Sequence, residues 1–170
     1  HIVPGCFIAE NTMLLKLLQA YAADEDVEAA FVFADMEKAF DRASWQFLEA
    51  ALPRVGLADF LPWFQLAYST RNPPLRRIYA NGFLSDWFPI LSGVAQGCPL
   101  SPLLFLLVTE VISRLIKYDP DFQGLTVGEA CHKISQFADD STFILGRGDA
   151  PRLAGHMKTW CGATCMCENV

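Results

Sequence analysis

The stretch that most limits the fold is KISQFADDSTFIL, residues 133–145, because two adjacent aspartates separate two apolar runs. The runs KISQFA and STFIL are typical of strands, so the stretch predicts a hairpin with Asp139 and Asp140 at its tip. Two carboxylates about 4 Å apart repel by roughly 4 kcal/mol at a protein-like effective dielectric. Either water at an ordinary turn or a bound cation must offset this repulsion.

The spacing of apolar residues predicts the other elements. VEAAFVFADM, residues 27–36, is a continuous apolar run that predicts a strand buried on both faces and ending in Asp35. Asn81 and Gly82 lie between apolar residues of segment 76–88 and predict a second hairpin. Helical spacing predicts helices over residues 11–21, 44–52, 59–68, 101–117 and about 150–163, with Asn11, Ser44 and Ser101 as N-caps.

This order of elements predicts an α+β fold. A strand, helices, a hairpin, a long helix, a second hairpin and a last helix are compatible with a split β-α-β antiparallel sheet of the ferredoxin-like type, with helices on one face. The long helix is predicted from apolar residues that share one side: Leu104, Leu107, Val108, Val111, Ile112 and Leu115.

The composition indicates a folded domain and limits its partners. With 170 residues, 52% hydrophobic and 19% charged, the chain suits one domain or a well-buried part of a larger one. The net charge of −6 argues against tight binding to a phosphate backbone, because nonspecific nucleic-acid affinity comes from lysine and arginine. The longest apolar run, residues 102–108, is too short to span a bilayer, so no membrane partner is expected.

Three of the cysteines lie close together as C-x3-C-x-C, at Cys161, Cys165 and Cys167. This is not a usual zinc spacing, so we interpret them as thiols of a protein in a reducing compartment. The chain starts at His1 without a methionine, and we expect it to be a fragment of a longer protein.

Asp35 and Asp139 each follow a run that resembles a central strand. If the two strands are neighbours in one sheet, both carboxylates meet at its edge with Asp140 beside them. Carboxylate oxygens suit Mg²⁺, and two such ions about 3.5–4 Å apart stabilise the attacking and leaving oxygens of a phosphoryl transfer. The alternative is that Asp139 and Asp140 are ordinary turn residues and that Asp35 merely ends a strand.

Three motifs between and around these acids resemble successive motifs of the reverse transcriptase domain of non-LTR (LINE-type) retrotransposons. They are FADMEKAFDRASWQFL, GVAQGCPLSPLLFLLVTEVISRLI and QFADDSTFIL, in that order. PGCFIAENTMLLKLLQAY upstream and WCGATCMCENV at the end resemble flanking segments of the same family. The resemblance implies a polymerase palm with part of the fingers: about 1–26 and 56–92 as fingers or palm helices and hairpin, 27–55 and 93–170 as palm core, and no thumb.

The resemblance also assigns roles to single residues. Asp35 and Asp139 match the two metal-binding catalytic aspartates, and Asp140 is an adjacent acid that contributes less directly. Residues matched to nucleotide binding are Phe40, which packs under the incoming sugar and favours deoxynucleotides, and Met36, Gln96 and Gly97. Pro99 and Pro102 would fix the junction between the loop and the helix. Arg71, Arg76 and Arg77 of TRNPPLRR are expected to contact nucleic acid or to be merely solvated.

The implied activity is that of an RNA-directed DNA polymerase, which extends a DNA primer on an RNA template during retrotransposition. The implied cofactor is Mg²⁺, as two ions, with Mn²⁺ as a substitute. The partners would be RNA template, DNA primer and dNTPs, together with the missing fingers, thumb and endonuclease regions of the same polyprotein. The parent element would act inside the cell, in the nucleus, after transit through the cytoplasm as a ribonucleoprotein.

Two departures from the family pattern leave alternatives open. Cys6 stands where the family usually has arginine, and Ala95 stands where many relatives have arginine. One alternative is a degenerate retroelement remnant that binds nucleic acid without catalysis. The other is an RNA-dependent RNA polymerase, although those enzymes typically carry an acid at the position of Phe40. The isolated fragment is expected to have little or no activity.

Overall fold

The structure is a computed structural model, which describes residues 8–36, 39–137 and 140–166 of the 170-residue chain. It is a mixed α+β structure whose described residues form six α-helices and small antiparallel sheets, which confirms the predicted α+β class. The assignment of these elements to a polymerase palm stays a prediction. The chain divides into two compact units. We call them the sheet unit, with described residues from 8–36 and 109–163, and the ribbon unit, with described residues from 39–108 and 164–166.

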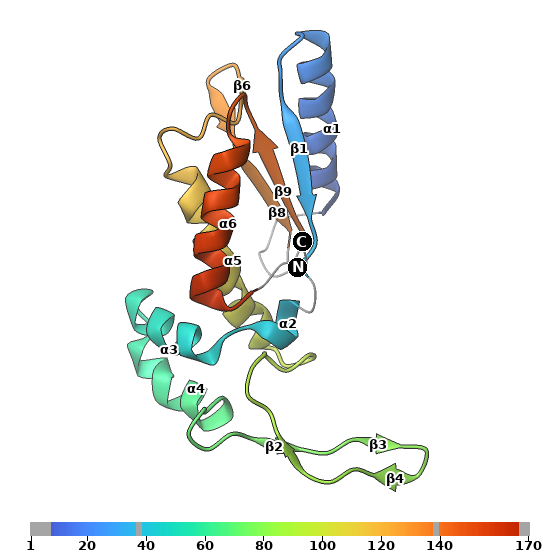
Figure 1. Cartoon of the computed structure of the whole chain (residues 1–170), viewed down its shortest axis with the longest axis vertical. Coiled ribbons are helices and arrows are strands. Elements are labelled where there is room, and N and C mark those ends of the chain that lie inside the picture. Colours follow the sequence, from blue (N-terminus) through green and yellow to red (C-terminus); the bar gives the residue numbers. More distant parts are fainter. Residues whose placement is uncertain (1–7, 37–38, 138–139, 167–170) are drawn as a thin grey trace. The chain divides into compact units, whose positions relative to one another are not determined.

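The sheet unit contains a three-stranded antiparallel sheet in the order β1-β9-β8 (Figure 1). Strand β1 (Ala30–Ala34) pairs with β9 (Asp140–Leu145), which pairs in turn with β8 (Ile134–Phe137). Phe137 lies opposite Asp140, so the hairpin predicted from residues 133–145 is confirmed. Asp139 lies outside the described residues.

Strand β1 was predicted to be central and buried on both faces, and this is wrong. Among the described strands β1 pairs only with β9, so it lies at an edge, and the side chain of Phe33 is 66% exposed. The central strand is β9, in which every residue after Asp140 is buried. An apolar run indicates that both faces of a strand can be covered by other elements. It does not indicate how many strands pair with that strand, and this number decides whether the strand is central or at an edge.

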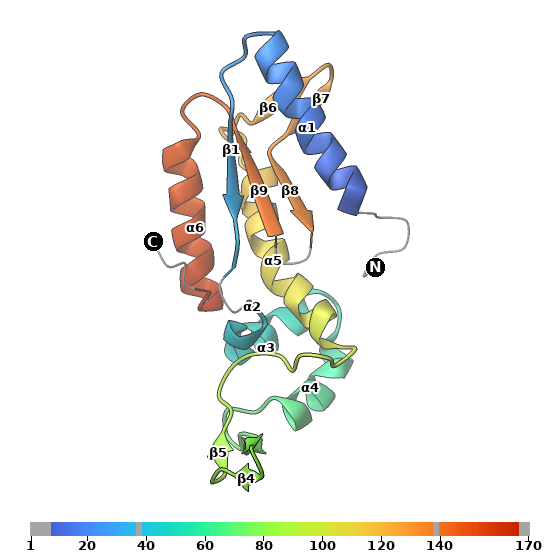
Figure 2. The ribbon, with the colours of Figure 1, turned by 90° about the vertical axis from the view of Figure 1, so that its right-hand side faces the viewer.

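Helices cover both faces of this sheet, where the sequence predicted one covered face (Figure 2). Helix α1 (Ile8–Asp24) packs Leu18 against Ile144 of β9. Helix α6 (Ala150–Thr164) lies against the opposite face, because Leu153 and Met157 line a cavity with Val32 and Phe143. Successive residues of a strand point to opposite faces, so a strand that is apolar at every position needs a helix on each side.

Two of the three predicted N-caps differ in the structure. Ser44 does cap helix α3 (Trp45–Arg54), since its hydroxyl accepts a hydrogen bond from the Phe47 N–H at 3.3 Å. Asn11 instead lies inside α1, which begins at Ile8, and its side-chain oxygen accepts a hydrogen bond from Ser135 at 2.8 Å. Ser101 is the first residue of helix α5 (Ser101–Lys117), and its hydroxyl donates to the carbonyl of Ala95 at 2.6 Å.

The sheet unit also contains a short hairpin that the sequence analysis missed. Strands β6 (Leu125–Val127) and β7 (Ala130–His132) pair antiparallel around Gly128, whose φ is +61°. The glycine was the only local signal, and strands of three residues are too short to show an alternating pattern. The bounds of helix α5 were predicted correctly, but its buried side was predicted only in part. Leu104, Val108 and Ile112 are buried as predicted, together with Phe105 and Ile116, whereas Leu107, Val111 and Leu115 are half-buried.

The ribbon unit begins with four short helical segments and continues as a long two-stranded ribbon. After α2 (Ala39–Arg42) and α3 come a 3-10 turn at Ala58–Phe60 and α4 (Leu61–Ala67). In the ribbon β2 (Leu75–Arg76) pairs with β5 (Phe88–Pro89), and β3 (Tyr79–Ala80) pairs with β4 (Phe83–Leu84). Asn81 and Gly82 both have positive φ, at 51° and 85°, so the predicted two-residue turn is confirmed.

Across the described ranges, the helices are all too short or too polar to pass through a lipid bilayer.

Candidate functional site

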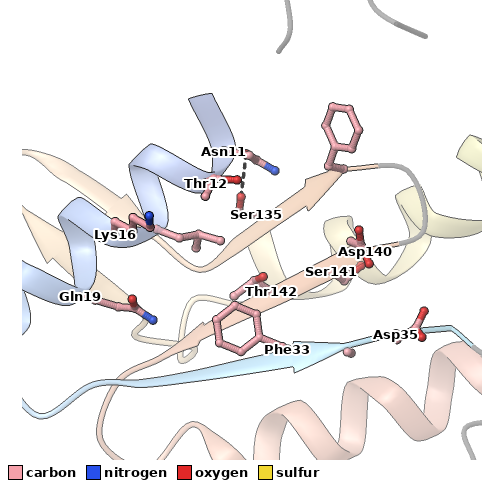
Figure 3. Close-up of a pocket in the computed structure, with 13 residues that line it drawn as sticks. Asn11, Thr12, Lys16, Gln19, Phe33, Asp35, Ser135, Asp140, Ser141 and Thr142 are labelled. Carbon is pink, nitrogen blue, oxygen red and sulfur yellow. Dashed lines mark hydrogen bonds between the residues drawn. The ribbon is translucent and has the colours of Figure 1, made fainter. Parts of the chain in front are cut away.

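Two of the predicted acids, Asp35 and Asp140, lie where the paired strands β1 and β9 meet at one end of the sheet (Figure 3). Ala34, the last residue of β1, is the register partner of Ser141. The next residue along β1 is Asp35, and the residue before Ser141 is Asp140, so the two aspartates continue this antiparallel register. Both side chains are exposed and line one cavity of about 410 Å³. The structure therefore brings together two acids that are far apart in the sequence.

The opposite wall of this acid cavity is a polar side of helix α1. Thr12, Lys16 and Gln19 line it, and among the residues that the structure describes Lys16 is the only basic one that does. Their spacing of four and three residues puts them on one side of a helix. That spacing was visible in the sequence, but the sequence analysis used α1 only for its apolar residues. The hydrogen bond between Asn11 and Ser135 joins α1 to β8 beside the cavity (Figure 3).

The chemistry of the two acids fits a hard divalent cation. Neither carboxylate makes an ion pair or a side-chain hydrogen bond with any residue that the structure describes. Mg²⁺ commonly takes one or two protein carboxylates and completes its shell with water and phosphate oxygens. Within the described ranges there is no cluster of three or more histidine, cysteine, aspartate or glutamate side chains that could hold a metal. Among the described residues, Asp35 and Asp140 are thus the carboxylates available to a cation. Asp139, which precedes Asp140 in the sequence, lies outside the described residues.

The predicted nucleotide-binding residues of the ribbon unit share a second cavity. Phe40, Gln96 and Gly97 line a space of about 450 Å³ together with Cys98, Pro99, Ser101 and Pro102. Phe40 is half-buried and stacks on Phe105 of α5, with the ring centroids 4.8 Å apart. The Phe40 ring therefore contacts Phe105 on one side and lines the cavity on another. Met36, which directly follows Asp35, is half-buried in the sheet unit.

Long-range hydrogen bonds hold the segment 93–97 that carries Gln96. The Trp45 indole donates to the carbonyl of Gly93 at 2.6 Å, and the Val94 N–H donates to the carbonyl of Phe40 at 2.7 Å. Ala95 is held from both sides, since its N–H donates to the Tyr68 hydroxyl at 3.3 Å and its carbonyl accepts from Ser101. Sequence reasoning missed Trp45 and Tyr68 because their partners are distant in the chain.

Gly93 is required at the start of this segment by two independent features. Its φ is +86°, a conformation that residues with a side chain rarely adopt. A Cβ atom built there would lie 2.6 Å from the backbone oxygen of Asp41. Gly97 also has a positive φ, of +83°, but a Cβ there would meet nothing within 4 Å.

The three predicted nucleic-acid contacts, Arg71, Arg76 and Arg77, are exposed residues of the ribbon unit. Arg76 lines a cavity of about 730 Å³ that Gln96 also lines. The guanidinium of Arg77 lies over the ring of Trp87, 4.7 Å from its centroid.

Comparison with known proteins identifies the family. The family described as "Reverse transcriptase (RNA-dependent DNA polymerase)" matches residues 3–164. The chain is 30% identical over 147 residues to the "Transposon TX1 uncharacterized 149 kDa protein" of Xenopus laevis, covering 85% of the chain and 11% of that protein. It is 31% identical over 137 residues to the "Retrovirus-related Pol polyprotein from type-2 retrotransposable element R2DM" of Drosophila melanogaster, covering 80% of the chain and 12% of that protein.

A third relative is a "Retrovirus-related Pol polyprotein from type-1 retrotransposable element R2" of Popillia japonica, 34% identical over 118 residues, covering 68% of the chain and 19% of that protein. The chain thus spans between about a tenth and a fifth of the length of these relatives. The match over residues 3–164 covers nearly all of the chain, and its relatives are proteins of non-LTR retrotransposons, as the motifs indicated. The chain belongs to the reverse transcriptase family.

Proposed function

We propose that the chain supplies the catalytic centre of an RNA-directed DNA polymerase that copies a retrotransposon RNA. In this reaction the primer 3′-oxygen attacks the α-phosphorus of a deoxynucleoside triphosphate, and pyrophosphate leaves. The observation that carries the proposal is the position of Asp35 and Asp140, two exposed carboxylates that continue the register of neighbouring strands and line one cavity. Membership of the reverse transcriptase family supports a DNA product.

In the proposal Asp35, Asp139 and Asp140 hold divalent ions, Mg²⁺ or its substitute Mn²⁺. Members of this family generally use such ions, which would stabilise negative charge on the attacking and leaving oxygens. The backbone at Asp35 and Asp140 is held by the paired strands β1 and β9, so little backbone reorganisation would be needed there when ligands bind. Lys16, on the opposite wall of the acid cavity, offers a positive charge toward phosphate oxygens.

Phe40, Met36, Gln96 and Gly97 are proposed to position the nucleotide. The Phe40 ring cannot shift easily, because it is half-buried and stacked on Phe105. A rigid ring under the incoming sugar would leave no room for a 2′-hydroxyl and would select deoxynucleotides. The hydrogen bonds on Gly93 and Ala95 would hold Gln96 against the template base.

A direct test of the cation site uses the 170-residue chain. Titration with Mn²⁺, followed by NMR, should broaden the amide signals around Asp35 and Asp140 before others. Asp35→Asn and Asp140→Asn should each weaken this broadening, whereas Glu129→Gln, an exposed acid in the β6–β7 turn, should not. Equal broadening in all four proteins would refute the site.

A test of the activity uses the complete polypeptide that contains the chain. Asp35→Asn or Asp139→Asn should abolish primer extension on an RNA template and leave the fold intact, as judged by circular dichroism. Glu129→Gln should extend primers at the parent rate. Retained extension in the aspartate variants would refute the assignment, and a parent that binds Mn²⁺ without extending primers would be a degenerate remnant.

The role of Phe40 is tested by comparing dNTP and rNTP incorporation. Phe40→Ala should raise rNTP incorporation relative to dNTP, because the alanine leaves space for the 2′-hydroxyl. Phe105→Leu alters the supporting ring without touching the nucleotide and should change this ratio less. A parent protein that prefers rNTPs would instead be an RNA-dependent RNA polymerase.

A further inference from the structure

The ribbon of residues 75–89 exposes several large aromatic side chains. Tyr79 is 71% exposed, Phe83 is 79% exposed and Trp87 is 60% exposed. Aromatic rings contribute most when they are buried, and a cluster of exposed ones marks an interaction site more often than chance exposure does. A protein-like core cannot form around this ribbon, because it consists of only two strands.

A bulge in the ribbon sets one arginine beside one of these rings. Arg76 is the register partner of Phe88, and Ile78 and Ser85 exchange hydrogen bonds, with the Ser85 N–H donating to the Ile78 carbonyl at 2.9 Å. Arg77 therefore stands opposite two residues, Asp86 and Trp87, as in a β-bulge. Its guanidinium lies 4.7 Å from the centroid of the Trp87 ring.

The charge of the ribbon opposes that of the chain. Residues 75–89 contain two arginines and one aspartate, a formal charge of +1, and Arg71 just before them raises it to +2, in a chain whose net charge is −6. The basic residues are all arginines, whose planar guanidinium groups stack on bases as well as pairing with phosphates. An acidic partner would need only the arginines, and a purely apolar partner would need only the exposed aromatic rings. Neither partner explains why the ribbon has both.

The base of the ribbon opens toward the segment that carries Gln96. Arg76, Phe88 and Gln96 line the same 730 Å³ cavity, and all three belong to the ribbon unit. A polymer bound at Gln96 therefore has a continuous path within this unit to Arg76 and Phe88.

We propose that Arg77, Tyr79 and Trp87 form a stacking platform, here called the ribbon platform, for single-stranded RNA. Phe83 is not part of it, because Phe83 is the register partner of Ala80 and therefore lies on the other face of the ribbon from Tyr79. Bases would stack on the exposed rings and on the guanidinium of Arg77, while the N–H groups of Arg76 and Arg77 would pair with the phosphates. Such binding tolerates any sequence, because every base has a flat π-face. The choice of RNA rests on the proposed function, in which the template is RNA; the platform itself requires only an unpaired strand.

The test is fluorescence anisotropy of a labelled 12-nucleotide single-stranded RNA with the 170-residue chain. EDTA is present, so that neither the metal nor catalysis contributes. Trp87→Ala and Tyr79→Ala should each weaken binding by about fivefold to a hundredfold, the range measured for loss of one stacked base. Trp87→Phe, which keeps a ring, should restore most of the affinity. Trp63→Ala is the matched control, because Trp63 is a 68% exposed tryptophan of α4 in the same unit.

Several outcomes would overturn the ribbon platform. These are equal losses in the Trp87→Ala and Trp63→Ala variants, or duplex RNA bound as tightly as the single strand. A DNA strand of the same sequence bound more tightly than the RNA would overturn the choice of RNA as the occupant. A platform that serves instead for self-association would show a dimer in sedimentation that Trp87→Ala dissolves, with RNA affinity unchanged. The result is independent of the primer extension test, since RNA binding in EDTA can fail while extension succeeds, and the reverse.

Discussion

Gly93 shows how a single residue supports the proposed template-positioning segment. The Trp45 indole donates to its carbonyl, and its own backbone runs against Asp41 too closely for any side chain. The segment 93–97 is therefore held at its start by a glycine, through its backbone alone.

Gly93→Ala should destabilise the ribbon unit strongly. The left-handed conformation costs an alanine about 1–2 kcal/mol, and the contact with Asp41 adds about 1–3 kcal/mol more. Gly97→Ala, which has a similar φ but open space, should cost only the first of these amounts. The measurement is the free energy of unfolding in urea for both variants, and equal losses would show that the close contact is not as the structure has it.

The sequence pointed to the individual acids but not to the residues that hold the segment 93–97 in place. Asp35 and Asp140 were singled out because carboxylates at strand ends have a recognisable chemistry, and in the structure both line one cavity beside the paired strands β1 and β9. Their functional role stays a prediction. Trp45 and Tyr68 were not identified, because a hydrogen bond to a residue 48 or 27 positions away leaves no local pattern. The catalytic role of Asp139 stays a prediction.

Among the elements, the start of helix α6 depends on one buried acid. Asp149 is 1% exposed, and its carboxylate accepts hydrogen bonds from the backbone N–H groups of Gln123, Gly124 and Gly146 at 2.8–2.9 Å. It joins the end of β9 and the start of α6 to the segment that leads into β6. Sequence reasoning passed over Asp149 as an ordinary residue before a helix.

Asp149→Ala should destabilise the sheet unit by about 3–5 kcal/mol, because three backbone donors lose a charged acceptor. Asp121→Asn is the control. Asp121 is an exposed acid that pairs with Arg152, and its loss should change stability by less than about 1 kcal/mol. Urea unfolding followed by circular dichroism measures both, and a small effect at Asp149 would contradict the observed network.

A second link between elements should respond to pH. The side chain of His156 on α6 hydrogen-bonds Asp119 at 2.8 Å, and this bond is the main cause that lowers the pKa of Asp119 below its usual value of 3.8. A carboxyl whose pKa is lower in the folded state stabilises the fold above its unfolded pKa. This stabilisation should therefore disappear as the pH falls below about 4 and through the folded pKa.

The measurement is the free energy of unfolding between pH 6 and pH 2, compared for the parent chain and Asp119→Asn. The variant should be less stable near pH 6, and the two curves should converge at low pH. Curves that stay parallel throughout would show that Asp119 carries no such linkage. Asp59→Asn, an exposed acid of the 3-10 turn, serves as the control for general acid effects.

Element prediction succeeded where a local signal was strong. The Asn81-Gly82 turn, the Ser44 cap and helices α5 and α6 were predicted from turn residues, caps and spacing, and were confirmed. The β6–β7 hairpin was missed for want of length, and α1 began earlier than the proposed cap because Ala9 and Glu10 extend the helix. Both helices that cover the sheet were predicted, but their placement on opposite faces was not, because the contact of Leu18 with Ile144 joins residues far apart in the sequence.

For the whole molecule, the charge distribution predicts how nucleic-acid binding depends on salt. The net charge of −6 leaves Arg71, Arg76 and Arg77 as the proposed source of attraction. Three phosphate contacts on a single strand give a slope of about −2 in a plot of log affinity against log salt concentration. This is shallow compared with proteins that hold long stretches of duplex.

Replacing Arg76 and Arg77 together by glutamine should reduce that slope to about −0.7. Arg114→Gln is the control, since Arg114 is an exposed arginine of α5 that pairs with Glu110. Anisotropy titrations between 50 and 300 mM salt, concentrations of the order used to measure such slopes, give the comparison. An unchanged slope in the double variant would place the phosphate contacts elsewhere.

The family and the α+β class were predictable for the whole chain, because three motifs in order are specific together and apolar patterning fixes the class. The neighbours of each strand were not, since pairing depends on contacts across more than 100 residues, such as those of Ala34 with Ser141.

The edge position of β1 has a practical consequence for handling the chain. No described strand occupies its outer side, and the strand contains no charged residue to discourage pairing with another molecule. An exposed strand edge of this kind can pair with strands of other molecules, which leads to aggregation. Purified at high concentration, the chain should precipitate more readily than its Val32→Lys variant, which puts a charge inside β1, and turbidity at matched concentrations measures the difference.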